Sequence, residues 1–334
     1  MNKNYNNDNV LTKGFVDAEI EPGLDLKAEI RKLCAEKKAV ILAHYYQDPK
    51  IQDIADFIGD SLYLSQQAAK TNAEIIVFCG VHFMAETAKI LCPDKKVLLP
   101  DMNAGCSLAN SCPADDFSKF LEKYPGHTVI SYINTTAQIK ALSDIICTSS
   151  NAVQIIQSIP ENQPIIFAPD KNLGNYIESI SGREMVIWNG ACHVHEEFSL
   201  ERILELKQIH PDAKIIAHPE CKKQVLIIAD FVGSTSALLK YTMKDSAEKY
   251  IVATESGILH QMRKANPQKT YIAAPPIDST CGCSDCFYMK LNNTRKLYNC
   301  LKFEMPEIRV EENLRKKAEK SIIRMLEISE RLGL

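Results

Sequence analysis

Nine short apolar runs, each of four or five residues, alternate with more polar stretches along the chain. Continuous apolar runs of this length predict parallel strands that are covered on both faces. The runs form three groups of three. In chain order they are residues 39–43, 74–78 and 96–100, then 128–132, 164–168 and 184–188, then 214–217, 250–254 and 270–274.

Helical patterns separate these runs. One precedes each group, at residues 24–37, 115–124 and 199–210, and the charged, periodic segment 308–334 predicts a closing helix. Strands that alternate with helices predict an α/β fold of small three-layer αβα sandwiches with parallel sheets. Right-handed crossovers then bring the loops after the strands to one edge of each sheet.

The three groups are copies of one unit. Stretches that begin at Ala43, Ser131 and Ala217 align, and the first and third share AH at the start and ADF(I/V)G further on. In each copy an aspartate lies twelve residues, and a hydroxyl residue seventeen residues, after the first marked position. The matched positions are His44, Tyr132 and His218, then Asp56, Asp144 and Asp230, then Ser61, Ser149 and Thr235.

Identical offsets in three copies predict three homologous domains rather than a solenoid, whose repeats are shorter. We expect the domains to cover residues 24–106, 107–192 and 193–290, with a C-terminal helical segment, 291–334, packed on them. We also expect pseudo-threefold symmetry around a central active-site cavity.

Polar residues follow the first strand of each copy, where open α/β sheets bind ligands. Two residues beyond the first marked position come Tyr46, Asn134 and Glu220. Each residue alone is consistent with an ordinary turn or cap, but the matched spacing favours one shared pocket. We expect a helix to begin at each marked hydroxyl residue, which predicts either a helix cap or an anion site at the free N–H groups.

Cysteines follow the third strand of each copy, at Cys106, at Cys192, and at Cys281, Cys283 and Cys286. One thiolate from each copy suits an iron–sulfur cluster with one open iron, whereas four ligands suit zinc or an electron-transfer cluster. The C-x-C-x-x-C run is equally consistent with zinc or a redox pair. The other seven cysteines are expected to be buried apolar residues: Cys34, Cys79, Cys92, Cys112, Cys147, Cys221 and Cys300.

Composition narrows the class of protein. The 334 residues carry a formal net charge of −3, which argues against a nucleic-acid binder with a broad basic surface. No apolar run reaches the roughly 20 residues of a membrane span, and the polar residues 1–10 do not resemble a signal peptide. We expect a cytoplasmic protein, in which twelve cysteines indicate core residues and metal ligands rather than disulfides.

The sequence resembles the type A quinolinate synthase family, iron–sulfur enzymes of bacterial NAD biosynthesis. The resemblance extends from Ala39 to Met289 and is carried by AHYYQ, GDS, AGCSLA, YIN, CTSSNA, WNGACHVHE, HPEC, GST, VATESGI and the terminal C-x-x-M. It implies three αβα domains around a central cavity. It also implies a transferase-type condensation of iminoaspartate with dihydroxyacetone phosphate, which yields quinolinate, phosphate and two waters.

The resemblance further implies a 4Fe–4S cluster held by three cysteines, with one open iron that acts as a Lewis acid in dehydration. Cys106 and Cys192 match the family motifs directly. For the third ligand, repeat spacing favours Cys281, but the C-x-x-M motif favours Cys286, which we adopt. A redox role for Cys281 and Cys283 is doubtful because their spacing departs from that of some relatives.

The resemblance also assigns the substrate contacts. Tyr46, His218 and Glu220 are the candidates for proton transfer, and His195 orients the cluster or the substrate or is structural. Substrate-binding residues carried over from the family are His44, Ser61, Tyr132, Ile133, Asn134, Ser149, His218, Pro219, Glu220 and Thr235. His195 is added to this set because it lies three residues after the ligand Cys192.

Two other interpretations stay open. One is a 4Fe–4S hydro-lyase that acts on another small dicarboxylate, and the other is a non-catalytic zinc-binding or cluster-carrier protein. An L-aspartate oxidase that produces iminoaspartate is a candidate partner, although no motif supports docking. Neither nucleic acid nor a membrane is an expected partner.

Overall fold

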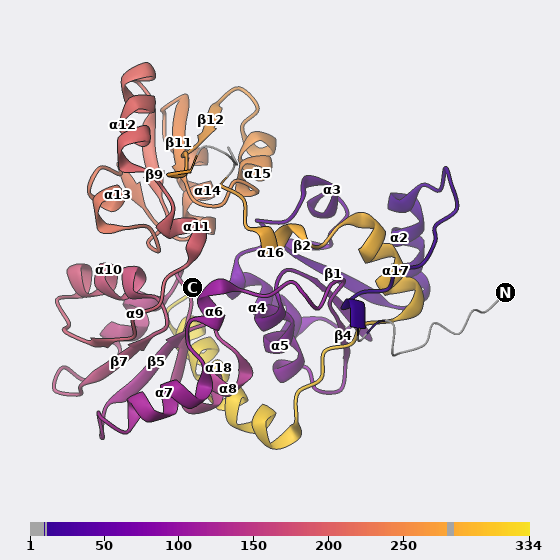
Figure 1. The fold of residues 1–334 in the computed structure, drawn as a ribbon, viewed down its shortest axis with the longest axis horizontal. Helices are drawn as coiled ribbons and strands as arrows, with labels where there is room; N and C mark the ends of the chain where they lie inside the picture. Colours follow the sequence, from indigo (N-terminus) through magenta and orange to yellow (C-terminus); the bar gives the residue numbers. More distant parts are fainter. Residues whose placement is uncertain (1–9, 11, 279–283) are drawn as a thin grey trace. The chain divides into compact units, whose positions relative to one another are not determined.

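The computed structural model describes residue 10, residues 12–278 and residues 284–334. The chain divides into two compact units. The first comprises Met1–Cys106 and Phe287–Glu312, and the second comprises Ser107–Cys286 and Asn313–Leu334. The described residues form three parallel sheets of four strands each, with helices between the strands, as Figure 1 shows. This confirms the predicted α/β class with parallel sheets.

The first unit contains one sheet. Its core joins helix α2, strand β1 and helix α17, since Ile30, Ile41 and Leu297 belong to one buried cluster. The strand order is β2-β1-β3-β4. The strands are β1 (Ala39–His44), β2 (Phe57–Gly59), β3 (Ile75–Cys79) and β4 (Lys96–Leu98), and the helices are α2 (Leu26–Glu36), α3 (Pro49–Gln52), α4 (Ser61–Lys70), α5 (His82–Leu91), α16 (Phe287–Lys290) and α17 (Thr294–Phe303).

The second unit contains two sheets, with strand orders β6-β5-β7-β8 and β10-β9-β11-β12. Each sheet has a buried cluster of its own, around Phe117 and Ile166 in one and around Ile203 and Ile251 in the other. The strands of the first are β5 (Thr128–Tyr132), β6 (Ile145–Cys147), β7 (Ile165–Ala168) and β8 (Val186–Ile187), and those of the second are β9 (Lys214–Ala217), β10 (Phe231–Val232), β11 (Lys249–Ala253) and β12 (Thr270–Ala273).

Helices connect these strands and cover the two sheets. The C-terminal helix α18 (Glu312–Arg331) belongs to the second unit from Asn313 onward. The other helices of this unit are α6 (Ser107–Asn110), α7 (Ala114–Leu121), α8 (Ala137–Leu142), α9 (Ala152–Gln157), α10 (Lys171–Ser181), α11 (His193–Glu196), α12 (Leu200–Ile209), α13 (Lys223–Ile227), α14 (Thr235–Lys244) and α15 (Ile258–Ala265).

All nine predicted strands are present, and each sheet has the same internal order. The first predicted strand of each copy lies between the second predicted strand and a short edge strand. These edge strands, β2, β6 and β10, have two or three residues each and were not among the predicted strands. The matching order supports three αβα units of one kind, while their pseudo-threefold symmetry stays a prediction.

The repeated aspartate has one structural role in all three copies. Asp56 accepts a hydrogen bond from the backbone N–H of Ile41 at 2.8 Å and returns one from its own N–H to the Ile41 carbonyl. Asp144 makes the same pair of bonds with Val129, and Asp230 makes it with Ile215. Each aspartate therefore fastens the start of an edge strand to the first strand of its sheet.

The Asp144→Ala variant tests this role. The substitution removes the acceptor of the Val129 N–H and is expected to lower the free energy of unfolding by about 1 kcal/mol. Asp144→Asn keeps an acceptor oxygen and should stay close to wild type. Urea denaturation of the three proteins measures the difference, and equal losses in both variants would contradict the assigned role.

The predicted helix starts are correct for two copies and wrong for the third. Helix α4 begins at Ser61 and α14 at Thr235, but α9 begins at Ala152, so Ser149 lies in the preceding turn. The capping prediction was wrong as well. The α4 and α14 caps are the residues immediately before, Asp60 and Ser234, whose side chains accept backbone N–H groups.

Candidate active site

The first marked residue of each copy lies where its strand ends, as predicted. His44 is the last residue of β1, Tyr132 is the last residue of β5, and His218 directly follows β9. His44 and His218 each accept the same kind of local hydrogen bond. The backbone N–H two residues later donates to Nδ1, from Tyr46 at 3.2 Å and from Glu220 at 3.4 Å. The copies therefore place these rings by the same turn.

In the first unit, His44 and Tyr46 form a buried pair. Their ring centroids are 4.4 Å apart in an edge-on arrangement. Lys290 of α16 donates through Nζ to the Tyr46 carbonyl at 2.7 Å. The amide of Gln47 donates to the Met289 carbonyl at 2.9 Å. The loop after β1 is thus held by Met289, the last residue of the C-x-x-M motif, and by Lys290, which follows it.

Cys106 ends the first unit's loop after β4 and is partly exposed. Hydrogen bonds hold the part of this loop that precedes Cys106. Asp101 accepts the backbone N–H of Asn103 at 2.9 Å, and the Ala104 carbonyl accepts the backbone N–H of His82 at 2.7 Å. Cys106 is consequently presented from an ordered turn and is partly exposed.

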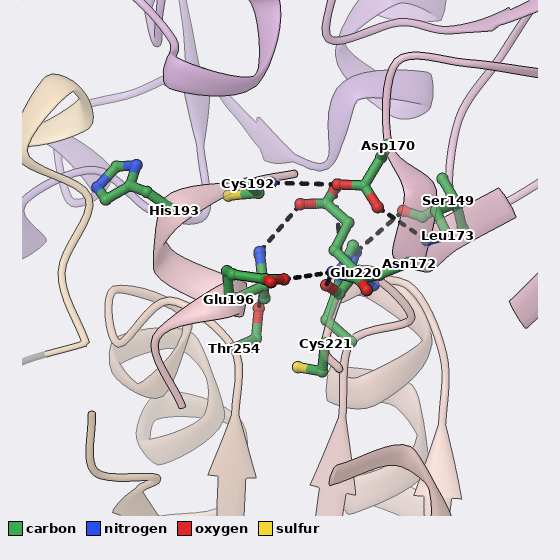
Figure 2. A network of polar contacts seen from close by, with 12 residues as sticks. Ser149, Asp170, Asn172, Leu173, Cys192, His193, Glu196, Glu220, Cys221 and Thr254 are labelled. Carbon is green, nitrogen blue, oxygen red and sulfur yellow. Dashed lines mark hydrogen bonds and ion pairs between the residues drawn. The ribbon is translucent and has the colours of Figure 1, made fainter. Parts of the chain in front are cut away.

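In the second unit, polar side chains of the second and third copies meet at Glu220 (Figure 2). The Tyr132 hydroxyl donates to Glu220 Oε1 at 2.5 Å, and His195 Nδ1 lies 2.9 Å from Oε2. His195 Nε2 is 3.0 Å from the hydroxyl oxygen of Thr254. Tyr132, His195 and Glu220 are all buried, Glu220 with 2% of its surface exposed. The predicted convergence of Tyr132 and Glu220 is therefore present within this unit.

His218 and Ser149 extend the same network. The rings of His218 and His195 stack with centroids 4.8 Å apart. His218 Nε2 is 3.2 Å from the Ser149 hydroxyl oxygen. The next residue, Ser150, donates to the hydroxyl of Ser234, the cap that precedes Thr235. Ser149 thus lies beside the buried His218, and the residue after Ser149 is bonded to the residue before Thr235.

Asn134 has a buried side-chain oxygen without a hydrogen-bond partner among the described residues. Its neighbour Ile133 is buried, and so is Pro219 beside Glu220. A buried amide oxygen normally has a partner, because an unpaired one costs about 1–3 kcal/mol. The Asn134 side chain therefore offers an unpaired acceptor just beyond the end of β5.

Two buried carboxyl groups of this network have pKa values that are shifted in opposite directions. Burial alone raises the pKa of Glu220, but the histidines His195 and His218 and the Tyr132 hydroxyl outweigh it and hold that pKa below its ordinary value. Burial, and then the charge of Glu220, raise the pKa of Asp170 well above its ordinary value. The surroundings thus favour the ionised form of Glu220 and the neutral form of Asp170, and acid–base sites use carboxyl groups separated in this way.

Asp170 also anchors the backbone of a cysteine loop. Its Oδ2 accepts the N–H of Cys192 at 3.2 Å, and its Oδ1 caps α10 through the N–H of Leu173 at 2.8 Å. Gly190 allows this approach, since a Cβ there would lie 2.5 Å from the Pro169 carbonyl oxygen. Cys192 is thereby fixed beside the Glu220 network.

The cysteines divide into two classes by burial. Cys106, Cys192 and Cys286 are partly exposed, whereas the seven cysteines predicted to be core residues are all buried. Burial raises the thiol pKa of each of those seven, which keeps them protonated and makes them poor metal ligands. The three exposed thiols are the ones that the family motifs select, so their chemistry fits a three-cysteine cluster. Cys281 and Cys283 lie outside the described residues.

Within the second unit, Cys192 and Cys286 pack against the same buried cluster. Glu255 accepts the backbone N–H of Cys286 at 3.0 Å. Cys192, His195 and Glu220 offer ligand atoms that lie within 4.8 Å of one another, so this part of the site is able to hold a metal ion.

Sequence reasoning missed Asp170 and Thr254. Both follow the second strand of their copy, β7 and β11, at the same sheet edge as the marked residues. The rule that ligands bind beyond the carboxyl ends of strands applies to these positions too. The sequence predictions used the residues after the first and third strands of each copy and left out those after the second.

The chain was compared with known proteins. The family model described as quinolinate synthetase A protein matches residues 28–327. The chain belongs to this family. A quinolinate synthase of Thermosynechococcus vestitus is 63% identical over 306 residues, which cover 92% of this chain and 96% of the relative. The quinolinate synthase of Microcystis aeruginosa is 61% identical over 91% of this chain and 95% of its own length.

A third quinolinate synthase, from Trichormus variabilis, is 57% identical over 324 residues, 96% of this chain and its full length. The quinolinate synthetase A family thus accounts for both units of the chain and for every marked position. Separately, no helix in the described part of the chain is both long and apolar enough to cross a membrane.

Proposed function

We propose that this protein is a quinolinate synthase that acts in NAD biosynthesis in the cytoplasm. The reaction condenses iminoaspartate with dihydroxyacetone phosphate and yields quinolinate, inorganic phosphate and two waters. Membership of the quinolinate synthetase A family supports quinolinate synthesis. The observation that carries the proposal is the buried Glu220 network, which combines an ionised carboxylate with a tyrosine and two histidines.

In this proposal Glu220, His218 and Tyr46 move protons during isomerisation and water loss. The Glu220 carboxylate receives the Tyr132 hydroxyl hydrogen bond, and it lies 3.9 Å from His218 Nδ1. Tyr132 and His195 lie within hydrogen-bond distance of Glu220, so a proton can pass between either of them and the carboxylate without entering bulk water. Positioned acids and bases of this kind typically contribute about 10²–10⁴-fold to a rate.

Substrate anions are assigned to the polar groups around that network. The imidazoles of His195 and His218 and the hydroxyls of Ser149 and Thr235 are donors for the carboxylates of iminoaspartate. Asn134 adds an amide whose oxygen lacks a partner within the described chain. His44, Ser61, Ile133, Pro219 and the Tyr132 hydroxyl complete the proposed set of contacts.

Cys106, Cys192 and Cys286 are the proposed ligands of a 4Fe–4S cluster. Their partial exposure, against seven buried and protonated thiols, is the support for this choice. When bound, the cluster supplies a Lewis acid at its open iron for the loss of a hydroxyl group. The chain's own contribution is to hold the Cys192 backbone through Asp170 and the Cys286 backbone through Glu255.

Zinc binding is a second candidate, because Cys192, His195 and Glu220 supply sulfur, nitrogen and oxygen ligands within 4.8 Å of one another. Metal and acid-labile sulfide analysis after anaerobic purification separates the two functions. Iron with sulfide supports the synthase, and zinc without sulfide would overturn it.

An anaerobic assay of the reconstituted protein tests the reaction itself. Quinolinate and inorganic phosphate in equal amounts, formed from iminoaspartate and dihydroxyacetone phosphate, are the expected result. A hydro-lyase that acts on another dicarboxylate would form neither product. Addition of an L-aspartate oxidase in the same assay supplies iminoaspartate and tests that enzyme as the partner.

A further inference from the structure

Two serines lie on the buried face of the C-terminal helix α18. Ser321 and Ser329 have no exposed surface, and their neighbours on this face, Ala318, Ile322 and Met325, are equally buried. A hydroxyl in an apolar helix face needs a partner, since an unpaired buried polar group is costly. Ser329 contacts a turn of the second αβ copy, and Ser321 contacts helix α8 of the same copy.

Ser329 is bonded to the turn that carries Ser149. Its hydroxyl oxygen accepts the side-chain N–H of Asn151 at 2.9 Å. The Asn151 side-chain oxygen in turn accepts the backbone N–H of Thr148 at 2.6 Å and its hydroxyl at 3.1 Å. Asn151 and Thr148 are buried and bracket Ser149 in the sequence, so Ser329 fixes the backbone that presents Ser149 to His218.

Ser321 is bonded to the helix behind the Tyr132 loop. Its hydroxyl donates to the backbone carbonyl of Lys140 in α8 at 2.8 Å. Lys140 is fully buried, and its ammonium group donates to the carbonyl of Ile133 at 3.0 Å and also to that of Thr135. Those two carbonyls flank Asn134, so the loop after β5 is held between Lys140 and the sheet.

We propose that α18 is a positioning element of the active site, in which Ser321 and Ser329 hold the two loops that carry Tyr132–Asn134 and Ser149. The proposal rests on the proposed function for the identity of the ligand. Neither serine touches the Glu220 network itself. Each acts through one intermediate side chain, Ser321 through Lys140 and Ser329 through Asn151.

A purely structural role for the hydroxyls is the competing explanation. Ser321 also lies within hydrogen-bond distance of the Ala318 carbonyl of its own helix, and Ser329 donates to that of Met325. The hydroxyl of Thr242 in α14 makes a bond of this kind, to the Leu239 carbonyl at 2.9 Å, and Thr242 is equally buried. Thr242→Val is therefore a matched control that removes a buried helix hydroxyl away from both loops.

The experiment compares Ser321→Ala, Ser329→Ala and Thr242→Val in the full-length, cluster-containing protein. Quinolinate binding is measured by calorimetry and stability by thermal melting. Each serine variant is expected to weaken quinolinate binding by about 3- to 10-fold, the effect of one lost hydrogen bond, with a melting-temperature shift similar to that of the control. Binding losses no larger than in Thr242→Val would overturn the proposal.

Hydrogen–deuterium exchange provides a readout that is independent of the ligand. Ser329→Ala should accelerate exchange at residues 148–151, and Ser321→Ala should accelerate it at residues 133–140, while Thr242→Val changes neither segment. Unchanged exchange in these segments would refute the positioning role even if binding fell. A wild-type protein that neither forms nor binds quinolinate, with both segments responding as expected, would instead refute the proposed function and leave the loop contacts established.

Discussion

Replacement of Glu220 by glutamine is expected to abolish quinolinate formation while the iron and sulfide contents stay unchanged. The amide has nearly the same shape, so the stacked His195 and His218 rings keep their packing. It cannot carry the negative charge, and an NH₂ group replaces one of the oxygens that face Tyr132 and His195. Because a proton-transfer group is lost, turnover should fall by at least about 10²–10⁴-fold.

A second glutamate supplies the control for this variant. Glu205 lies exposed on α12, and Glu205→Gln should leave turnover unchanged. Product formation by Glu220→Gln, measured anaerobically at saturating substrate and at wild-type cluster content, is the decisive measurement. Activity within a few-fold of wild type would remove Glu220 from the mechanism.

Replacement of Cys106 by alanine is expected to remove the cluster altogether. Two cysteine ligands are too few to retain a cluster that needs three, and the buried thiols cannot replace the missing ligand because they stay protonated inside the cores. Iron and acid-labile sulfide per chain, together with the visible absorbance of the reconstituted protein, should fall to background. Catalysis should be lost with them.

Cys112→Ala is the matched control, because Cys112 lies six positions after Cys106 in the sequence, is fully buried and packs beside Phe117. Burial raises the pKa of its thiol to about 12. This variant should lose some stability through its smaller side chain but keep full iron and sulfide. Wild-type iron content in Cys106→Ala, or loss of the cluster in Cys112→Ala, would contradict the ligand assignment.

The fold followed from the sequence because its main signals are periodic. Continuous apolar runs predicted nine of the twelve strands in the described residues, all but the edge strands β2, β6 and β10, and the repeated aspartates marked a hydrogen bond that the structure has three times. The seven buried cysteines were also predicted correctly, because a free cysteine usually packs as a small apolar residue in the core. These features depend on burial, which a sequence encodes directly.

The site was predicted less completely because it depends on contacts between distant segments. Repeat spacing selected Tyr132, Ser149 and Glu220, but it did not reveal that Glu220 is held by His195 or that Asp170 anchors Cys192. The helix start expected at Ser149 was wrong because Ser149 and the two residues after it form a turn, and α9 begins only at Ala152. Two positions at the same sequence offset need not have the same local structure. A short turn, such as the one at Ser149, changes the path of the backbone while the number of residues stays the same.

The aspartate bonds also explain which parts of each copy tolerate a change of length. Each aspartate lies fifteen positions after the strand residue whose N–H it accepts, so a hydrogen bond joins the two ends of the intervening segment. One inserted residue in this segment would disrupt that hydrogen bond. The segment between the last strand and the cysteine is held in a different way in each of the first two copies, by Asp101 through the Asn103 N–H and by Asp170 through the Cys192 N–H. The offset to the cysteine differs accordingly, with 62 residues from His44 to Cys106 and 60 from Tyr132 to Cys192, while the offset to the aspartate is twelve in every copy.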